Sequence, residues 1–100
     1  MNKICIIGWV YNIQEKTLDN GGASATFVVK TRKLVGKTRG YDYIPCDVRG
    51  KKGKTVVNNL NDGAKVQIWG RLNLKNDEDI NTLLESIAVD EIEFLDSYYK

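Results

Sequence analysis

The chain has 100 residues, a hydrophobic fraction of 42% and a formal net charge of +2, a composition that suits one domain with a single compact core. Its apolar runs fall short of the roughly 18 residues that a membrane helix needs, and its first ten residues lack the small-residue cleavage site of a signal peptide. We therefore expect residues 1–100 to form one cytoplasmic domain without a membrane span.

The chain has two cysteines and no histidine. Cys5 and Cys46 each lie in an alternating apolar run, so we expect two buried thiols that act as small hydrophobic side chains and form no disulfide. A zinc site needs a cluster of cysteine or histidine ligands. The sequence therefore predicts neither a metal site nor a cofactor.

The first predicted strand covers about residues 2–13. Because side chains alternate along a strand, its inward face carries Ile4, Ile6, Gly8 and Val10. The opposite face carries Cys5, Ile7, Trp9 and Tyr11. Both faces are apolar, so we expect the core to cover one side of this strand and a second surface to cover the other.

A turn at residues 18–22 separates this strand from a second one over about residues 23–32. The inward face of the second strand carries Ala25, Phe27 and Val29. Its outward face carries Ser24, Thr26, Val28, Lys30 and Arg32. A basic hairpin tip at residues 33–40 follows.

The third predicted strand covers residues 40–50 and has two different faces. The core face carries Ile44, Cys46 and Val48. The outer face carries Tyr41, Tyr43, Pro45, Asp47 and Arg49. Proline has no N–H to donate to a neighbouring strand, so Pro45 indicates either a bulge or a position without a partner.

The alternation of side chains with a period of two residues stops at residues 52–63. Here Val56, Val57 and Leu60 share one helical face, and Gly63 is a candidate C-terminal cap. The fourth predicted strand covers about residues 64–74. Its inward face carries Val66, Ile68, Gly70 and Leu72, and its outward face carries Gln67, Trp69, Arg71 and Asn73.

A turn at residues 75–79 precedes a fifth strand within about residues 80–95. Ile87 and Val89 alternate, as do Ile92 and Phe94, but the step from Val89 to Ile92 breaks the alternation. We therefore expect a bulge near Asp90.

Five strands with one helix between the third and the fourth predict an all-β fold with one short helix, the five-stranded OB-fold Greek-key barrel. That fold binds oligonucleotides on the face of its second and third strands. Gly8 and Gly70, inside strands, fit a tightly curved small barrel. The first and fourth strands would then pair, with Trp9 and Trp69 as outward cross-strand neighbours that either stack bases or are buried in a subunit contact.

The charges are separated along the chain. Residues 30–54 carry nine basic and two acidic groups, a net +7, whereas residues 76–100 carry eight acidic groups and one lysine, a net −7. A strongly basic middle third is compatible with a polyanion site on one surface. The acidic last quarter is expected to line the side away from the polyanion or to occupy another subunit's basic groove.

The chain resembles bacterial single-stranded DNA-binding proteins in the order and spacing of five segments, residues 2–8, 21–29, 42–51, 59–72 and 89–96. The resemblance implies an OB fold and binding of single strands without sequence preference. It also implies a homodimer or homotetramer with the first strand at the dimer contact, which would include Cys5, Ile7 and Trp9.

Two departures from that family stand out. Its members usually carry an acidic tail that recruits replication and repair partners, whereas this sequence ends soon after the predicted barrel, a truncation also similar to primosomal replication protein N. Of the positions where the family stacks bases, only Tyr43 is aromatic here. The other three correspond to Val35, Arg49 and Asp77.

A nonspecific single-strand site needs cations for the phosphates and flat aromatic rings for the bases. Tyr43 and Tyr41 are the candidate rings on the third strand. The candidate cations are Lys30, Arg32, Lys33, Lys37, Arg39, Arg49 and Lys51, and a further outward pair is Trp69 and Arg71.

We therefore expect nonspecific binding and protection of single-stranded DNA in replication, recombination or repair. The alternative is a dimeric OB-fold accessory module that docks replication or recombination proteins and contacts DNA only secondarily. An enzyme is disfavoured because the sequence has no histidine, no nucleophile beside a base and no glycine-rich phosphate loop.

Overall fold

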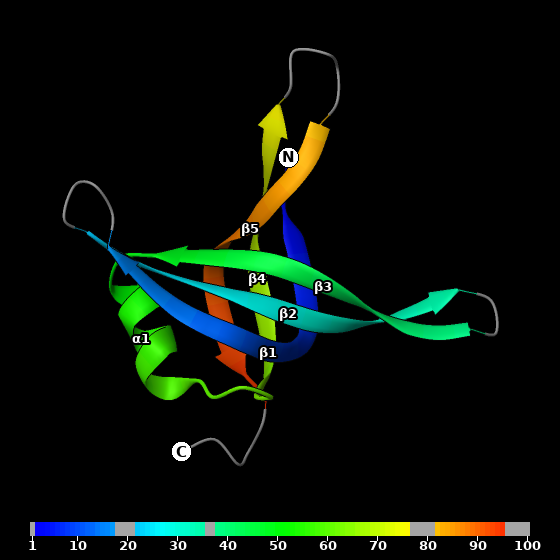
Figure 1. Ribbon diagram of the computed structural model, residues 1–100, viewed down its shortest axis with the longest axis horizontal. Coiled ribbons are helices and arrows are strands. Elements are labelled where there is room, and N and C mark those ends of the chain that lie inside the picture. Colours follow the sequence, from blue (N-terminus) through cyan, green and yellow to red (C-terminus); the bar gives the residue numbers. More distant parts are fainter. Residues whose placement is uncertain (1, 18–21, 36–37, 77–81, 96–100) are drawn as a thin grey trace.

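The computed structural model describes residues 2–17, 22–35, 38–76 and 82–95. Along the chain lie β1 (Ile4–Thr17), β2 (Ala23–Val35), β3 (Thr38–Arg49), α1 (Lys51–Asn59), β4 (Lys65–Asn76) and β5 (Thr82–Phe94). The strands close into one barrel in the order β1-β2-β3-β5-β4 (Figure 1). The five-stranded barrel expected from the sequence is confirmed, and the two predicted turns fall largely outside the described residues.

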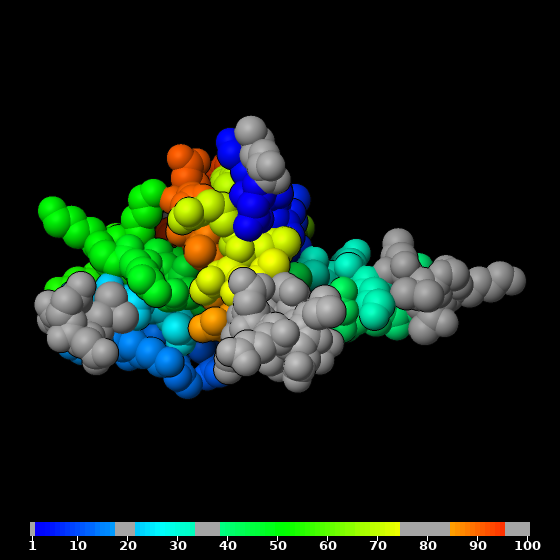
Figure 2. All heavy atoms as spheres, turned by 90° about the horizontal axis from the view of Figure 1, so that it is seen from above, coloured from blue at the N-terminus to red at the C-terminus, as the bar shows by residue number. Residues whose placement is uncertain are grey.

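The barrel is antiparallel except where β3 meets β5, at the parallel pairs Cys46↔Ile87 and Asp47↔Ala88. The β2–β3 hairpin extends from the barrel on the side opposite to α1 (Figures 1 and 2). The β4–β5 hairpin forms a second arm that rises away from both (Figure 1).

The core is made of the predicted inward faces. Its fully buried side chains include Val10, Phe27, Val29, Val48, Val66, Ile68 and Ile87. Each of these residues follows the alternation read from its strand, which is why period two was sufficient to identify them.

Two glycines set the curvature of the barrel. A Cβ atom on Gly8 would lie 2.3 Å from the carbonyl oxygen of Lys30, and one on Gly70 would lie 2.3 Å from the carbonyl oxygen of Ala88. Such distances are far below van der Waals contact, so a side chain at either position would push neighbouring backbones apart. The expectation that both glycines permit a tight barrel agrees with these close approaches.

α1 packs against β2, with further contacts to β1 and β3. Gly53 makes this possible, because a Cβ there would lie 2.9 Å from the carbonyl oxygen of Val48. The helix also covers Ser24, which is 4% exposed. The outward face expected for Ser24 is therefore covered here and not open to solvent, since alternation describes the strand and not what packs on it.

The helix ends earlier than the sequence indicated. Leu60 is its C-terminal cap residue, and the Leu60 N–H donates to the carbonyl of Val56 at 2.9 Å. Gly63 is not the cap. It lies at the turn before β4 with φ 89° and donates its N–H to the carbonyl of Val10 at 2.7 Å.

The predicted bulge in the last strand is confirmed. Trp69 pairs with Glu91 and Gly70 pairs with Val89, so Asp90 is the extra residue. The bulge predicted as one alternative for Pro45 is absent, because the β2–β3 register runs past the Val28↔Pro45 pair without a shift. Instead β1 bends, with a register shift between Tyr11 and Gln14 and a φ of 57° at Asn12.

Leu72 is 38% exposed, which corrects the inward position expected for it. The β1–β4 ladder begins at the Ile4↔Gly70 pair. Leu72 lies beyond that pair, where Asn2 bonds to its backbone through a side-chain amide. No full strand covers it there, so alternation alone does not bury it.

Candidate nucleic-acid interface

Three strands present aromatic and basic side chains on one continuous outer face. Lys30 pairs with Trp9 on one side and with Tyr43 on the other, and Arg32 pairs with Tyr41. We call the set the aromatic–basic face; it consists of Trp9, Tyr11, Lys30, Arg32, Tyr41 and Tyr43. Val10, between Trp9 and Tyr11, and Val29, next to Lys30, are fully buried. Alternation therefore places Trp9, Tyr11 and Lys30 on the outside of the barrel.

The cations of this face lie over its rings. The Lys30 ammonium is 4.1 Å from the centroid of the Tyr41 ring and 6.0 Å from that of Tyr11, and the Arg32 guanidinium is 5.4 Å from that of Trp9. Among the described residues, neither Lys30 nor Arg32 forms an ion pair. Their charges therefore remain available to an anion that approaches the face.

The tyrosine rings are open to solvent. Tyr41 is 48% exposed and Tyr43 is 63% exposed. Exposed rings beside unpaired cations combine the two requirements of single-strand binding, a π-surface for a base and a positive charge for its phosphate.

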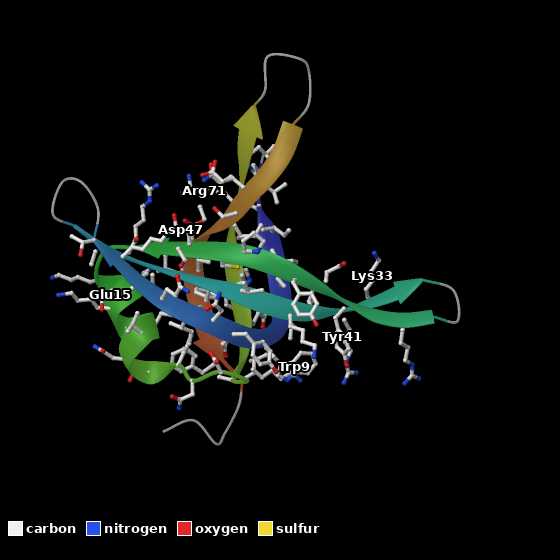
Figure 3. All side chains as sticks on the ribbon, in the orientation of Figure 1. Trp9, Glu15, Lys33, Tyr41, Asp47 and Arg71 are labelled. Carbon is white, nitrogen blue, oxygen red and sulfur yellow. The ribbon has the colours of Figure 1, made fainter. Side chains whose placement is uncertain are left out.

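The β2–β3 hairpin carries further basic side chains, and Figure 3 shows Lys33 on the opposite side of the hairpin from Tyr41. A recess of about 310 Å³ is lined by Arg32, Lys33, Arg39, Gly40 and Tyr41. Lys33 also lies 3.7 Å from Asp42, and both side chains of this pair are about half exposed. Lys37 is outside the described residues.

Arg49 and Arg71 lie elsewhere. Each forms an ion pair, Arg49 with Asp47 at 3.5 Å and Arg71 with Asp90 at 3.5 Å. The two pairs line a single groove of about 490 Å³. Figure 3 shows Arg71 and Asp47 on the side of β3 toward the β4–β5 arm, whereas Trp9 and Tyr41 lie on the opposite side.

Lys51 begins α1 and is exposed. Among the described residues, the cation–π contacts to Trp9, Tyr11 and Tyr41 do not include Lys51. The predicted cations therefore divide into a group on the aromatic–basic face and its hairpin, a pair at the groove, and Lys51.

The two tryptophans are not cross-strand neighbours, contrary to expectation. Trp69 pairs with Cys5 and Trp9 pairs with Lys65, so the indoles are offset by four residues along β1. The expectation followed from Gly8 and Gly70 both facing inward, which places both indoles outward but does not set the β1–β4 register. In the barrel a backbone carbonyl of β2 lies close to Gly8, and a backbone carbonyl of β5 lies close to Gly70.

The two cysteines also differ. Cys46 is buried as expected, and its burial raises the pKa of its thiol to about 12. Cys5 is exposed, which corrects the expectation of two buried thiols. It lies on the outer face of β1, where Gln67 donates to its sulfur at 3.1 Å. Ile7 on the same face is 48% exposed.

The sequence reasoning missed two members of this region, Tyr11 and Lys65. Tyr11 shares the outer face of β1 with Trp9, and that spacing of two residues could have identified it. Lys65 approaches Trp9 with its ammonium 5.9 Å from the ring centroid. Only the β1–β4 register brings Lys65 there, so no local signal could have found it.

Other kinds of site have little support. In the part of the chain that the structure describes, no group of three histidine, cysteine or acidic side chains is arranged to hold a metal ion. Among the same residues, no helix is long and apolar enough to cross a membrane.

Comparisons with known proteins agree with this geometry. The model of the single-strand binding protein family matches residues 1–95. A curated relative, single-stranded DNA-binding protein 1 of Clostridium acetobutylicum, is 28% identical over 105 residues, which span 97% of this chain and 96% of the relative. The crystal structure of a small single-stranded DNA-binding protein from Streptomyces coelicolor matches with a TM-score of 0.72 and 21% identity, covering 92% of this chain and 90% of that one. At that identity the structural match speaks for the fold alone.

Proposed function

Because the chain belongs to the single-strand binding protein family, we propose that it binds single-stranded DNA without sequence preference through its aromatic–basic face. Membership of that family makes it a binding protein and not an enzyme. Protection of unwound strands in replication, recombination or repair is the role that such binding serves.

One observation carries the proposal: basic and aromatic side chains alternate across three adjacent strands. The row Trp9, Lys30 and Tyr43 crosses β1, β2 and β3 in register. A single strand laid on such a row would place bases against rings and phosphates beside ammonium groups.

The same chemistry explains the absence of sequence preference. Every base has a π-face, so stacking on Tyr41 or Tyr43 does not distinguish one base from another. Lys30 and Arg32 would contact phosphates, which carry no sequence information.

Oligomer formation, which is typical of this family, would use a different surface. We place the subunit contact on the outer face of β1 and β4 around Cys5, Ile7 and Trp69. Ile7 is 48% exposed and Cys5 is also exposed, and apolar side chains gathered on a strand face are typical of protein contacts. Whether two or four subunits assemble is a question for light scattering.

The test is a titration of the full chain with oligo-dT of about 30 nucleotides, longer than the site of roughly 4–16 nucleotides that one OB fold covers. We expect a mobility shift, quenching of aromatic fluorescence and a micromolar or tighter Kd at low salt. The log–log slope of affinity against salt should be about −0.7 for each phosphate neutralised. Absence of both the shift and the quenching at low salt would refute the proposal.

A further inference from the structure

Trp9 lies between basic side chains that come from both neighbouring strands. On β2 its partner is Lys30, and on β4 its partner is Lys65. The Arg32 guanidinium lies 5.4 Å and the Lys65 ammonium 5.9 Å from the centroid of the indole. Because β1 stands between β2 and β4 in the barrel, these two cations approach the ring from opposite edges of its strand.

Trp69 has surroundings of a different kind. Its cross-strand partners are Cys5 and Glu91. The recess of about 430 Å³ beside it is lined by Ile4, Cys5, Asp90 and Glu91 together with Lys3 and Arg71. A carboxylate next to an indole repels a phosphate, so this recess is a poor place for a nucleic-acid strand.

We propose that Trp9 is a nucleobase-stacking subsite, with Arg32 and Lys65 holding the phosphates on the two sides of the stacked base. This inference rests on the proposed function and extends the path of the DNA over the barrel. The single-stranded DNA leaves the β2–β3 surface, crosses β1 at Trp9 and continues toward β4. Trp69 then belongs to the subunit contact with Cys5 and Ile7. Trp9, which the sequence placed in that contact, belongs to the nucleic-acid site.

Three features support this subsite. In a nucleotide chain each base has a phosphate on either side, which matches a flat ring with a cation on either side. Neither Arg32 nor Lys65 forms an ion pair among the described residues. A phosphate would therefore not have to displace a carboxylate from either cation. Trp9 and Tyr41 also project from the same side of the sheet, as Figure 3 shows, which makes one track of the two rings.

The two tryptophans allow a direct test, because Trp69→Phe leaves Trp9 as the sole indole and Trp9→Phe leaves Trp69. Each variant is titrated with dT30 while indole emission alone is excited. We expect quenching in Trp69→Phe at the affinity of the wild type and little quenching in Trp9→Phe. The reverse assignment, with quenching only in Trp9→Phe, would overturn the subsite.

Affinity supplies the second readout. Trp9→Ala should weaken dT30 binding about 5- to 150-fold, the range that one stacked base provides. Lys65→Ala should reduce the salt slope by about 0.7, the contribution of one phosphate. Lys3→Ala is the matched control, an exposed lysine at the Trp69 recess that should leave the slope unchanged. Circular dichroism of each variant establishes that the barrel has formed.

Light scattering distinguishes the remaining explanation. If Trp9 instead lies in a subunit contact, Trp9→Ala produces a smaller assembly whose affinity per subunit is unchanged, and the subsite is refuted. If the wild type does not bind dT30 at all, the proposed function fails together with the subsite. Binding by the wild type with unaltered affinity in both Trp9→Ala and Lys65→Ala refutes the subsite alone.

Discussion

The ammonium nitrogen of Lys30 lies 4.1 Å from the ring centroid of Tyr41, although the cross-strand partner of Lys30 is Tyr43. The lysine therefore reaches diagonally across the β2–β3 ladder and leaves the Tyr43 ring uncovered. A phosphate that draws Lys30 away would also uncover Tyr41. The two tyrosines would then offer adjacent surfaces to consecutive bases.

Reversing the charge of this face should abolish DNA binding. We expect Lys30→Glu with Arg32→Glu to weaken dT30 binding more than about 100-fold, because each glutamate replaces a phosphate contact with repulsion. The measurement is fluorescence anisotropy at low salt. Lys3→Glu with Lys54→Glu makes the same change in net charge at exposed positions off the face. An equal loss in both double variants would show that net charge, and not this face, determines binding.

This double variant also addresses the alternative of an accessory module. A protein whose main role is to dock partners would keep its partner complexes when Lys30 and Arg32 are reversed. A pull-down of replication or recombination proteins with wild type and variant, in the presence of nuclease, separates the two roles.

Tyr43→Ala should weaken DNA binding without weakening the fold. Tyr43 is 63% exposed, so we expect the free energy of unfolding to change by less than about 0.5 kcal/mol. Loss of a stacked base should cost about 1–3 kcal/mol of binding free energy. Tyr43→Phe keeps the ring and should bind as the wild type does. An affinity of Tyr43→Ala equal to that of Tyr43→Phe would mean that no base stacks there.

Gly70→Ala should destabilise the barrel. The added Cβ would lie 2.3 Å from the Ala88 carbonyl oxygen, a backbone atom that moves only with its strand. We expect a loss of about 2 kcal/mol or more in unfolding free energy, measured by urea denaturation. Gly40→Ala is the control, since nothing lies within 4 Å of its added Cβ. Similar stabilities of the two variants would contradict the close approach at Gly70.

Alternation along single strands was enough to predict the core faces and the barrel. Phe27 and Ile68 are buried where period two places them, and the broken period around Asp90 marks a real bulge. Such features depend only on residues adjacent in sequence, so they can be read before the fold is known.

The errors arose where distant segments meet. The Trp9 and Trp69 offset depends on the β1–β4 register, which closure of the whole barrel determines. Ser24 is buried by a helix that follows it by almost 30 residues in the chain. Leu72 is exposed because β1 does not extend over it. None of these contacts has a signature in the local sequence.

The buried thiol of Cys46 should make the protein less stable in alkali. Burial raises its pKa from 9.0 to about 12, so between these values the folded chain holds a proton that the unfolded chain has lost. The contribution is complete below pH 9 and falls as the pH rises toward 12. Near pH 10 we expect the wild type to have lost about 1.4 kcal/mol more than Cys46→Val, relative to pH 8.

Urea unfolding of both proteins at the two pH values provides the comparison. The valine variant controls for the lysines and tyrosines that titrate in the same range, because it shares all of them. Parallel pH dependence of wild type and Cys46→Val would mean that the Cys46 thiol ionises equally in the folded and unfolded chains.

The most direct test of the DNA-binding face is NMR mapping of the full chain as dT30 is added. We expect the largest changes in chemical shift at the rings of Trp9, Tyr41 and Tyr43 and at the side chains of Lys30 and Arg32, with α1 little affected. Perturbations confined to the β4–β5 arm or to α1, with these five side chains unchanged in a complex that has formed, would contradict the assignment of single-stranded DNA to the aromatic–basic face.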